Sequence, residues 1–146
     1  MKAIQDLYPD DFSHCYGCGS RNASGHQLKS RIDGAEVVAR FTPAPHHMSV
    51  PGFVYGGLLA SLVDCHAMAT AASSEITDSL APRFVTAVLH VEYLKPTPLG
   101  PELEIRGHVT ERSARKAIVE MTVTAGGIVT VRANAVAVRI PKSMES

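Results

Sequence analysis

The run from Leu58 to Ala72 is the feature that most constrains how this chain can fold. It is rich in Ala and Leu, which have high helix propensity, and it contains no Gly or Pro to interrupt a helix. Its residues are apolar on nearly every side, a pattern typical of a helix that other elements cover. The run therefore predicts one long, buried central helix.

Alternating apolar and polar residues on both sides of this helix predict strands. Two segments precede it, residues 27–32 and 36–41, and an Asp33-Gly34 turn joins them. After Pro82 the chain alternates throughout, in four further segments: residues 84–94, 102–110, 117–123 and 129–138. Short turns between consecutive segments predict a meander with one apolar face, which the helix must cover. The order ββ–α–ββββ predicts an α+β domain with an antiparallel sheet of five to six strands.

The segment from residue 84 to 94 is apolar on both faces. One face is predicted to carry Val85, Ala87, Leu89, Val91 and Tyr93, and Val88 adds an apolar side chain to the other. Such a strand, if unpaired along one edge, invites association with a second copy, and closed two-fold pairing is the commonest form. One sheet also covers only one side of a helix that is apolar on most sides. These features predict a homodimer.

Length, charge and cysteine content exclude several classes of function. At 146 residues the chain fits a single domain over residues 1–146, of which residues 1–25 form an N-terminal segment. Lys and Arg together number 14, as do Asp and Glu, so the chain lacks the positive charge that binds nucleic acid. Three cysteines, two of them close together, favour a reducing, cytoplasmic location. The first residues lack the apolar core of a signal peptide, and Asp64 interrupts the most apolar stretch, so we expect no membrane partner.

Four motifs lie along the chain: Cys15-x-x-Cys18-Gly19-x-x-Asn22-x-x-Gly25, Pro51-Gly52-Phe53-Val54-Tyr55-Gly56-Gly57, Asp64, and Val91-Glu92-Tyr93-Leu94-Lys95-Pro96. Together they resemble the hotdog-fold acyl-CoA thioesterases, and within them the branch of the phenylacetate pathway and of 4-hydroxybenzoyl-CoA. The resemblance implies a hotdog fold, in which the sheet wraps the central helix, and hydrolysis of an acyl-CoA to a free acid and CoA. It also implies no cofactor apart from the CoA of the substrate, and a homodimer or homotetramer with active sites shared between subunits.

Asp64 is the strongest chemical signal in the sequence. Burying a charged carboxylate in an Ala- and Leu-rich helix costs several kcal/mol unless partners compensate it. Perturbed acids of this kind cluster at functional sites, although an acid that faces a turn or caps a neighbouring strand is the alternative. The resemblance implies that Asp64, nine residues after Tyr55, is the general base or the nucleophile.

The start of the helix offers a second chemical feature. Backbone N–H groups in the first turn lack partners within the helix and lie at the positive end of its dipole. Gly56 and Gly57 let a ligand approach these groups and therefore suit an oxyanion, or else they form a simple helix cap. The resemblance implies that the Gly57 N–H is the oxyanion donor. The family usually has His where this chain has Tyr55, whose hydroxyl donates a hydrogen bond but is no base at neutral pH.

Further polar side chains are candidates for the site. Ser49 and Thr86 stand where the resembled family places polar groups near the attacking water. His46, His47 and His66 titrate near neutral pH, although a histidine more often has a structural role.

For substrate binding, we expect contacts from the helix, from the loop before it and from a basic strand turn. The turn offers cations to the CoA phosphates, or else it is an ordinary solvated turn. The residues concerned are Gly56, His47 and Met68, and in the turn Arg112, Arg115 and Lys116.

Cys15 and Cys18, with His14 and His26 nearby, raise the question of a zinc site. Structural zinc sites take four ligands, commonly from two paired clusters, and the sequence has no second Cys pair. A redox pair of the thioredoxin type also lacks its βαβ setting. We therefore expect no metal and interpret the motif as a structural loop.

Two other function classes fit parts of the sequence. A hotdog dehydratase or hydratase pairs a loop His with an acid on the helix, and His46 or His47 fits this superficially. The hydratase pattern of Asp, Asn-Pro and His in one segment is absent from the sequence, however. The other class is a non-catalytic acyl-CoA binding module, which Tyr55 in place of His favours. Assays of thioester hydrolysis and of enoyl-CoA hydration distinguish the three.

Overall fold

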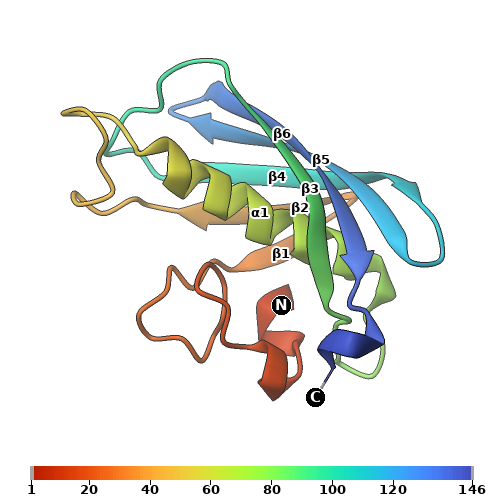
Figure 1. The fold of residues 1–146 in the computed structure, drawn as a ribbon. Coiled ribbons are helices and arrows are strands. Elements are labelled where there is room, and N and C mark those ends of the chain that lie inside the picture. Colours follow the sequence, from red (N-terminus) through yellow and green to blue (C-terminus); the bar gives the residue numbers. More distant parts are fainter. Residues whose placement is uncertain (1, 146) are drawn as a thin grey trace.

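The computed structural model describes residues 2–145, in which an α-helix lies against one antiparallel sheet (Figure 1). The helix, α1, spans Gly56–Ala72. The strands are β1 Ser30–Asp33, β2 Glu36–Phe41, β3 Phe84–Tyr93, β4 Leu103–Arg112, β5 Lys116–Ala125 and β6 Ile128–Arg139. Short 3-10 helices lie at Ile4–Leu7, Asp10–Phe12, Ser73–Glu75 and Lys142–Met144. Over residues 2–145, this one α-helix and six-stranded sheet confirm the predicted α+β architecture.

The order of the strands differs from the predicted meander. It runs β1-β2-β4-β5-β6-β3, so of the four strands that follow α1 only β4, β5 and β6 pair in the order of the sequence. The connection through α1 carries the chain from β2 to the opposite edge, where β3 pairs with β6. Alternation shows that a segment is a strand, but it does not show which strand pairs with which, because every strand has the same period.

α1 is buried along most of its length, as its composition predicts. The sheet covers one side of it with small side chains of β6, each at most 1% exposed: Ala133, Ala135 and Ala137. The N-terminal segment, red and orange in Figure 1, adds further cover, since Ile4, Tyr8, Cys18 and Leu28 join the same core. This segment therefore supplies part of the cover that one sheet cannot give. Among residues 2–145, no helix combines the length and apolar character needed to cross a membrane.

His66 is fully buried in a hydrogen-bonded network between α1 and the first strands. Its Nε2 donates to the carbonyl of Val37 at 2.9 Å, and its Nδ1 accepts from the hydroxyl of Ser30 at 2.8 Å. The Gln5 side chain completes the network, because its amide donates to Ser30 Oγ at 2.9 Å and accepts from Ser30 N–H at 2.7 Å. Burial lowers the pKa of His66 to about 4, which matches a neutral ring in this arrangement. His66 therefore has a structural role and is not available as a catalytic group.

β4 passes close to α1 at Gly107. A Cβ atom there would lie 2.9 Å from Oγ1 of Thr70 on α1 and 3.1 Å from Cγ of Met121 on β5. We predict that Gly107→Ala lowers the free energy of unfolding by about 1–3 kcal/mol, the range for overpacking a dense core. Chemical denaturation of the purified variant measures this loss.

Thr70→Ala provides the matched background for this prediction, because it removes the hydroxyl nearest to Gly107. In that background Gly107→Ala should cost less, since contacting residues couple in a double-mutant cycle. An equal cost in both backgrounds would contradict the contact as the cause.

Candidate active site

Asp64 lies on the side of α1 that faces β3, and in the single chain it is partly exposed. Thr86 of β3 donates a hydrogen bond from Oγ1 to Asp64 Oδ1 at 2.5 Å. The structure thus brings together two residues that the sequence singled out separately. The apolar neighbours of Asp64 in the sequence predict deep burial. In the structure its carboxylate instead has a hydrogen-bond partner and access to solvent.

A β-bulge turns Thr86 toward Asp64. The register of β3 against β6 shifts between residues 86 and 88, which leaves Ala87 as the extra residue. Because of this shift Thr86 lies on the inner face of the sheet together with Leu89, since their partners on β6 are two residues apart. The uniform alternation predicted for this strand is therefore wrong at its start, where Val85 faces outward.

Two tyrosine rings lie against the glycines at the start of α1. Tyr55 is the N-cap residue, and a Cβ at Gly57 would lie 2.5 Å from Cε2 of its exposed ring. A Cβ at Gly56 would lie 3.4 Å from the ring of Tyr93, whose hydroxyl donates to the Gly56 carbonyl at 2.8 Å. The glycines therefore allow these rings to approach the backbone closely. The sequence interpretation did not assign Tyr93 to the site, although it stands in the motif of residues 91–96.

A pocket of about 270 Å³ opens beside the start of α1. Its lining is Tyr16, His26, His46, His47, Tyr55, Gly57, Leu58 and Ser61. His47, an expected substrate contact, is oriented by the Ala44 N–H, which donates to its Nδ1 at 2.9 Å. Burial lowers the pKa of His26 and of His47, and the nearby charge of His46 lowers both further, so neutral rings are favoured. The sequence interpretation missed His26 and Tyr16 as pocket residues, because they come from a segment far from residues 46–61.

The two halves of the predicted site lie apart in one chain. Asp64 is not among the described residues that line the pocket beside Gly57. The two residues are seven positions apart on α1, which is about 10 Å along its axis. In a single chain the predicted oxyanion donor and the predicted base therefore do not reach the same carbonyl group.

Two other predicted site residues lie away from both Asp64 and Gly57. Ser49 is exposed in the loop before α1, where its N–H donates to the Phe53 carbonyl at 2.9 Å. Met68 is only 3% exposed and belongs to the core. In the single chain α1 turns the Met68 side chain inward, away from the pocket beside Gly57.

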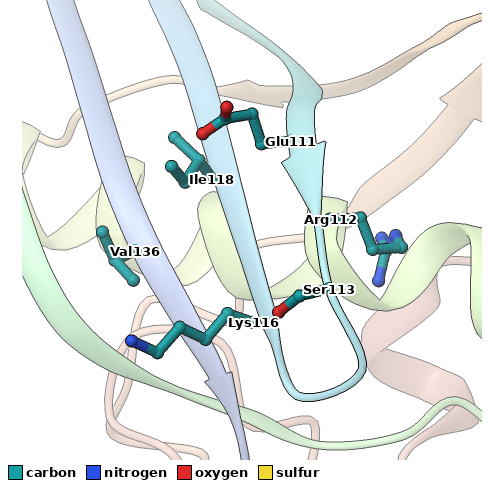
Figure 2. A pocket seen from close by; sticks show the side chains of 6 residues that line it. All are labelled: Glu111, Arg112, Ser113, Lys116, Ile118 and Val136. Carbon is teal, nitrogen blue, oxygen red and sulfur yellow. The ribbon is translucent and has the colours of Figure 1, made fainter.

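The cations at the turn between β4 and β5 do not converge. An open pocket of about 430 Å³ lies there, and Figure 2 shows Arg112 and Lys116 of its lining pointing away from each other. Arg112 forms an ion pair with Glu75 and donates to the Ala71 carbonyl at 2.7 Å, at the end of α1. Arg115 lies against main-chain carbonyls, the nearer at 3.4 Å. The expected phosphate site is therefore not assembled, because these arginines have contacts of their own.

β3 forms one edge of the sheet, and its apolar residues are exposed there. It stands last in the strand order, with β6 as its neighbour in the described sheet. Val88 and Tyr93 are 55% and 52% exposed, and Leu94, which follows the strand, is 43% exposed. The exposed Phe53 of the loop before α1 lies next to this region, because it bridges to Pro98. A long edge with exposed apolar side chains is a surface that pairs with another chain.

Comparison with known proteins identifies the protein family of this chain. The thioesterase superfamily profile matches residues 51–132, more than half of the chain. Two curated relatives, the acyl-coenzyme A thioesterases THEM4 of Mus musculus and Rattus norvegicus, are each 31% identical over 87 residues. The match covers 60% of this chain and 35% of each relative, so the chain spans about a third of their length.

Solved structures show the same fold. A thioesterase superfamily protein from Shewanella loihica PV-4 is 44% identical with a TM-score of 0.71, covering 90% of this chain and 98% of that chain. The Escherichia coli PaaI protein of the phenylacetic acid degradation operon is 15% identical with a TM-score of 0.68, covering 80% and 81%. A hypothetical thioesterase from Streptococcus pneumoniae TIGR4, solved with coenzyme A, is 19% identical with a TM-score of 0.64, covering 77% and 85%. The last two likenesses concern the fold alone.

The helix and sheet match the hotdog fold expected from the motifs. With a superfamily profile over more than half of its residues, the chain belongs to the thioesterase superfamily.

Proposed function

We propose that the chain is a thioester hydrolase that cleaves an acyl-CoA to a free acid and CoA. The observation that carries this proposal is the pair of Asp64 and Thr86, a carboxylate and a hydroxyl held together at the exposed edge of the sheet. Membership of the thioesterase superfamily supports the reaction type. Relatives named acyl-coenzyme A thioesterases, and a similar fold solved with coenzyme A, support the substrate class.

In this proposal the complete site lies between two copies of the chain, in a dimer or in a tetramer built from such dimers. Gly57 of one copy faces Asp64 of the other, which overcomes their separation along a single helix. The exposed apolar side chains of β3 and of the loop before α1 supply a surface for the pairing. A two-fold axis makes the contact self-complementary and forms two equivalent sites.

Catalysis follows from these groups. Asp64 accepts a proton from a water molecule that Thr86 helps to orient, and the resulting hydroxide attacks the carbonyl carbon of the thioester. The carbonyl oxygen becomes an oxyanion and accepts a hydrogen bond from the Gly57 N–H of the other copy. The C–S bond then breaks, the CoA thiolate leaves and takes up a proton, and the free acid is released.

A second route uses the same groups. Asp64 attacks the carbonyl carbon itself, which forms a mixed anhydride and expels the CoA thiolate, and water then opens the anhydride. Both routes consume one water molecule and require the ionised carboxylate. Tyr55, where the family usually has His, contributes a hydrogen bond toward the thioester in either route, because its exposed ring lies beside Gly57.

The first prediction from this proposal concerns Asp64→Asn. The change keeps the shape of the side chain and removes its charge, so turnover should fall by about 100- to 10,000-fold while the fold survives. Release of free thiol from a panel of aryl, short-chain and long-chain acyl-CoAs measures the loss, with enoyl-CoA hydration assayed beside it. Glu120→Gln is the matched control, because Glu120 is an exposed carboxylate on β5. Hydrolysis by Asp64→Asn at the parent rate would refute the assignment.

Tyr55 generates a second prediction. Tyr55→Phe keeps the ring beside Gly57 and removes the hydroxyl, so activity should fall about tenfold, as expected for one polar contact. Tyr55→His, which restores the family pattern, should remain active. Steady-state kinetics of both variants test this role. Complete loss of activity in Tyr55→Phe would instead make the phenol essential.

The shared site is tested by mixing two inactive variants under subunit exchange. Gly57→Val obstructs one half of the site, because even a Cβ there meets the Tyr55 ring, and Asp64→Asn removes the other half. A mixed dimer contains one site with both lesions and one with neither. Random exchange should therefore restore about a quarter of the parent activity. Each variant exchanged with itself is the control, and no recovery despite heterodimers seen by native mass spectrometry would contradict a shared site.

A further inference from the structure

Three thiols from two distant parts of the sequence meet where the N-terminal loop packs against α1. Cys15 and Cys18 come from the N-terminal loop and Cys65 from the helix, and their sulfur atoms all lie within 4.8 Å of one another. The Sγ atoms of Cys15 and Cys65 are 3.7 Å apart. The absence of a second Cys pair argued against a metal, but the fold supplies a third thiol from the helix.

The spacing of the sulfur atoms fits a thiophilic metal ion. In a tetrahedral zinc site with Zn–S bonds of about 2.3 Å, two sulfur ligands lie about 3.8 Å apart. The 3.7 Å between Cys15 and Cys65 agrees with that separation. It is far longer than the bond of about 2.05 Å in a disulfide.

The loop is built to bring its backbone against these thiols. A Cβ at Gly17 would lie 2.4 Å from Sγ of Cys65, so only a glycine lets the loop pack on the helix there. A Cβ at Gly19 would lie 2.4 Å from the Cys15 nitrogen, and the Gly19 N–H donates to the Cys15 carbonyl at 2.7 Å. The loop backbone therefore fits closely around the thiols.

A buried polar atom and a cation lie near the same thiols. The hydroxyl of Tyr8 is buried and has no hydrogen-bond partner within residues 2–145. Tyr8 belongs to the same buried core cluster as Cys18 and Cys65, and Cys15 packs against that cluster. The Arg83 guanidinium lies 5.0 Å from the centre of the Tyr8 ring, so a cation stands beside this group. A divalent ion with three thiolates carries a net negative charge, which a neighbouring cation stabilises.

We propose that Cys15, Cys18 and Cys65 bind one Zn²⁺ ion as three thiolates, with the fourth position open to a solvent ligand. The ion fastens the N-terminal loop to α1 and so stabilises the fold, as structural zinc does. It also holds the wall of the pocket beside the helix start, because Tyr16 stands between two of the ligands in sequence and lines that pocket.

The test uses the full chain, purified with its thiols reduced. Elemental analysis should find about one zinc per chain, and removal by a chelator should lower the melting temperature until Zn²⁺ is added back. Cobalt in place of zinc should give the charge-transfer absorption of thiolate ligands. These readouts do not involve thioester hydrolysis. They therefore test the zinc site independently of the proposed activity.

Single substitutions locate the ion. Cys15→Ser and Cys65→Ser should each weaken zinc binding by about 100-fold or more in a competition titration, since loss of a ligand exceeds the effect of losing an outer partner. Cys15 is only half-buried, so its variant is the one expected to keep the fold. His14→Ala is the matched control, because His14 is exposed, lies next to Cys15 and is not one of the three proposed ligands, so its loss should leave the affinity unchanged.

Three outcomes would overturn the proposal. Reduced wild-type protein that binds no zinc would refute the site, and so would equal affinity in Cys15→Ser and wild type. A disulfide between Cys15 and Cys65 that forms in air in the presence of zinc would assign the cluster to redox chemistry instead.

Discussion

α1 has no polar side to present to solvent, and much of the structure is arranged around covering it. Burying apolar surface gains about 25 cal/mol per Å², so each uncovered side of a helix of this composition is costly. The small side chains of β6, such as Ala135, let the sheet approach one side closely. The N-terminal segment covers more of the helix through Ile4 and Leu28. The loop that carries Cys15 and Cys18 is thus part of the core rather than an appendage.

The polar groups of α1 are each directed to a different element. Successive residues of a helix turn by about 100°, so Asp64, Cys65 and His66 leave the helix in three directions. Asp64 meets β3, Cys65 meets the N-terminal loop, and His66 bonds to the first two strands. One turn of the helix therefore carries a candidate catalytic group, a candidate metal ligand and a structural network. Each contact also fixes how α1 is rotated about its axis.

This arrangement separates the chemistry from the support for it. The neutral His66 ring and its partners are closed to solvent, so they cannot exchange protons with a substrate. Asp64 remains open because β3 is an edge strand, with no further strand beyond it among the described residues. That same edge exposes the apolar surface that the proposed pairing of two copies would bury. The proposed zinc ion acts from the other side, where the loop meets the helix.

The helix and the strands follow from the sequence, because periodicity and composition are local properties that neighbouring residues determine. Asp64 likewise stands out in the sequence as an acid within an apolar run. The sequence singles out Thr86 and Asp64 separately, and the hydrogen bond between them depends on a bulge at Ala87, which uniform alternation does not reveal. The position of β3 beside β6, the burial of His66 and the meeting of Cys65 with the loop were decided by the tertiary structure. Each depends on contacts between segments far apart in the chain, whose free energies compete over the whole fold and leave no periodic signal in the sequence.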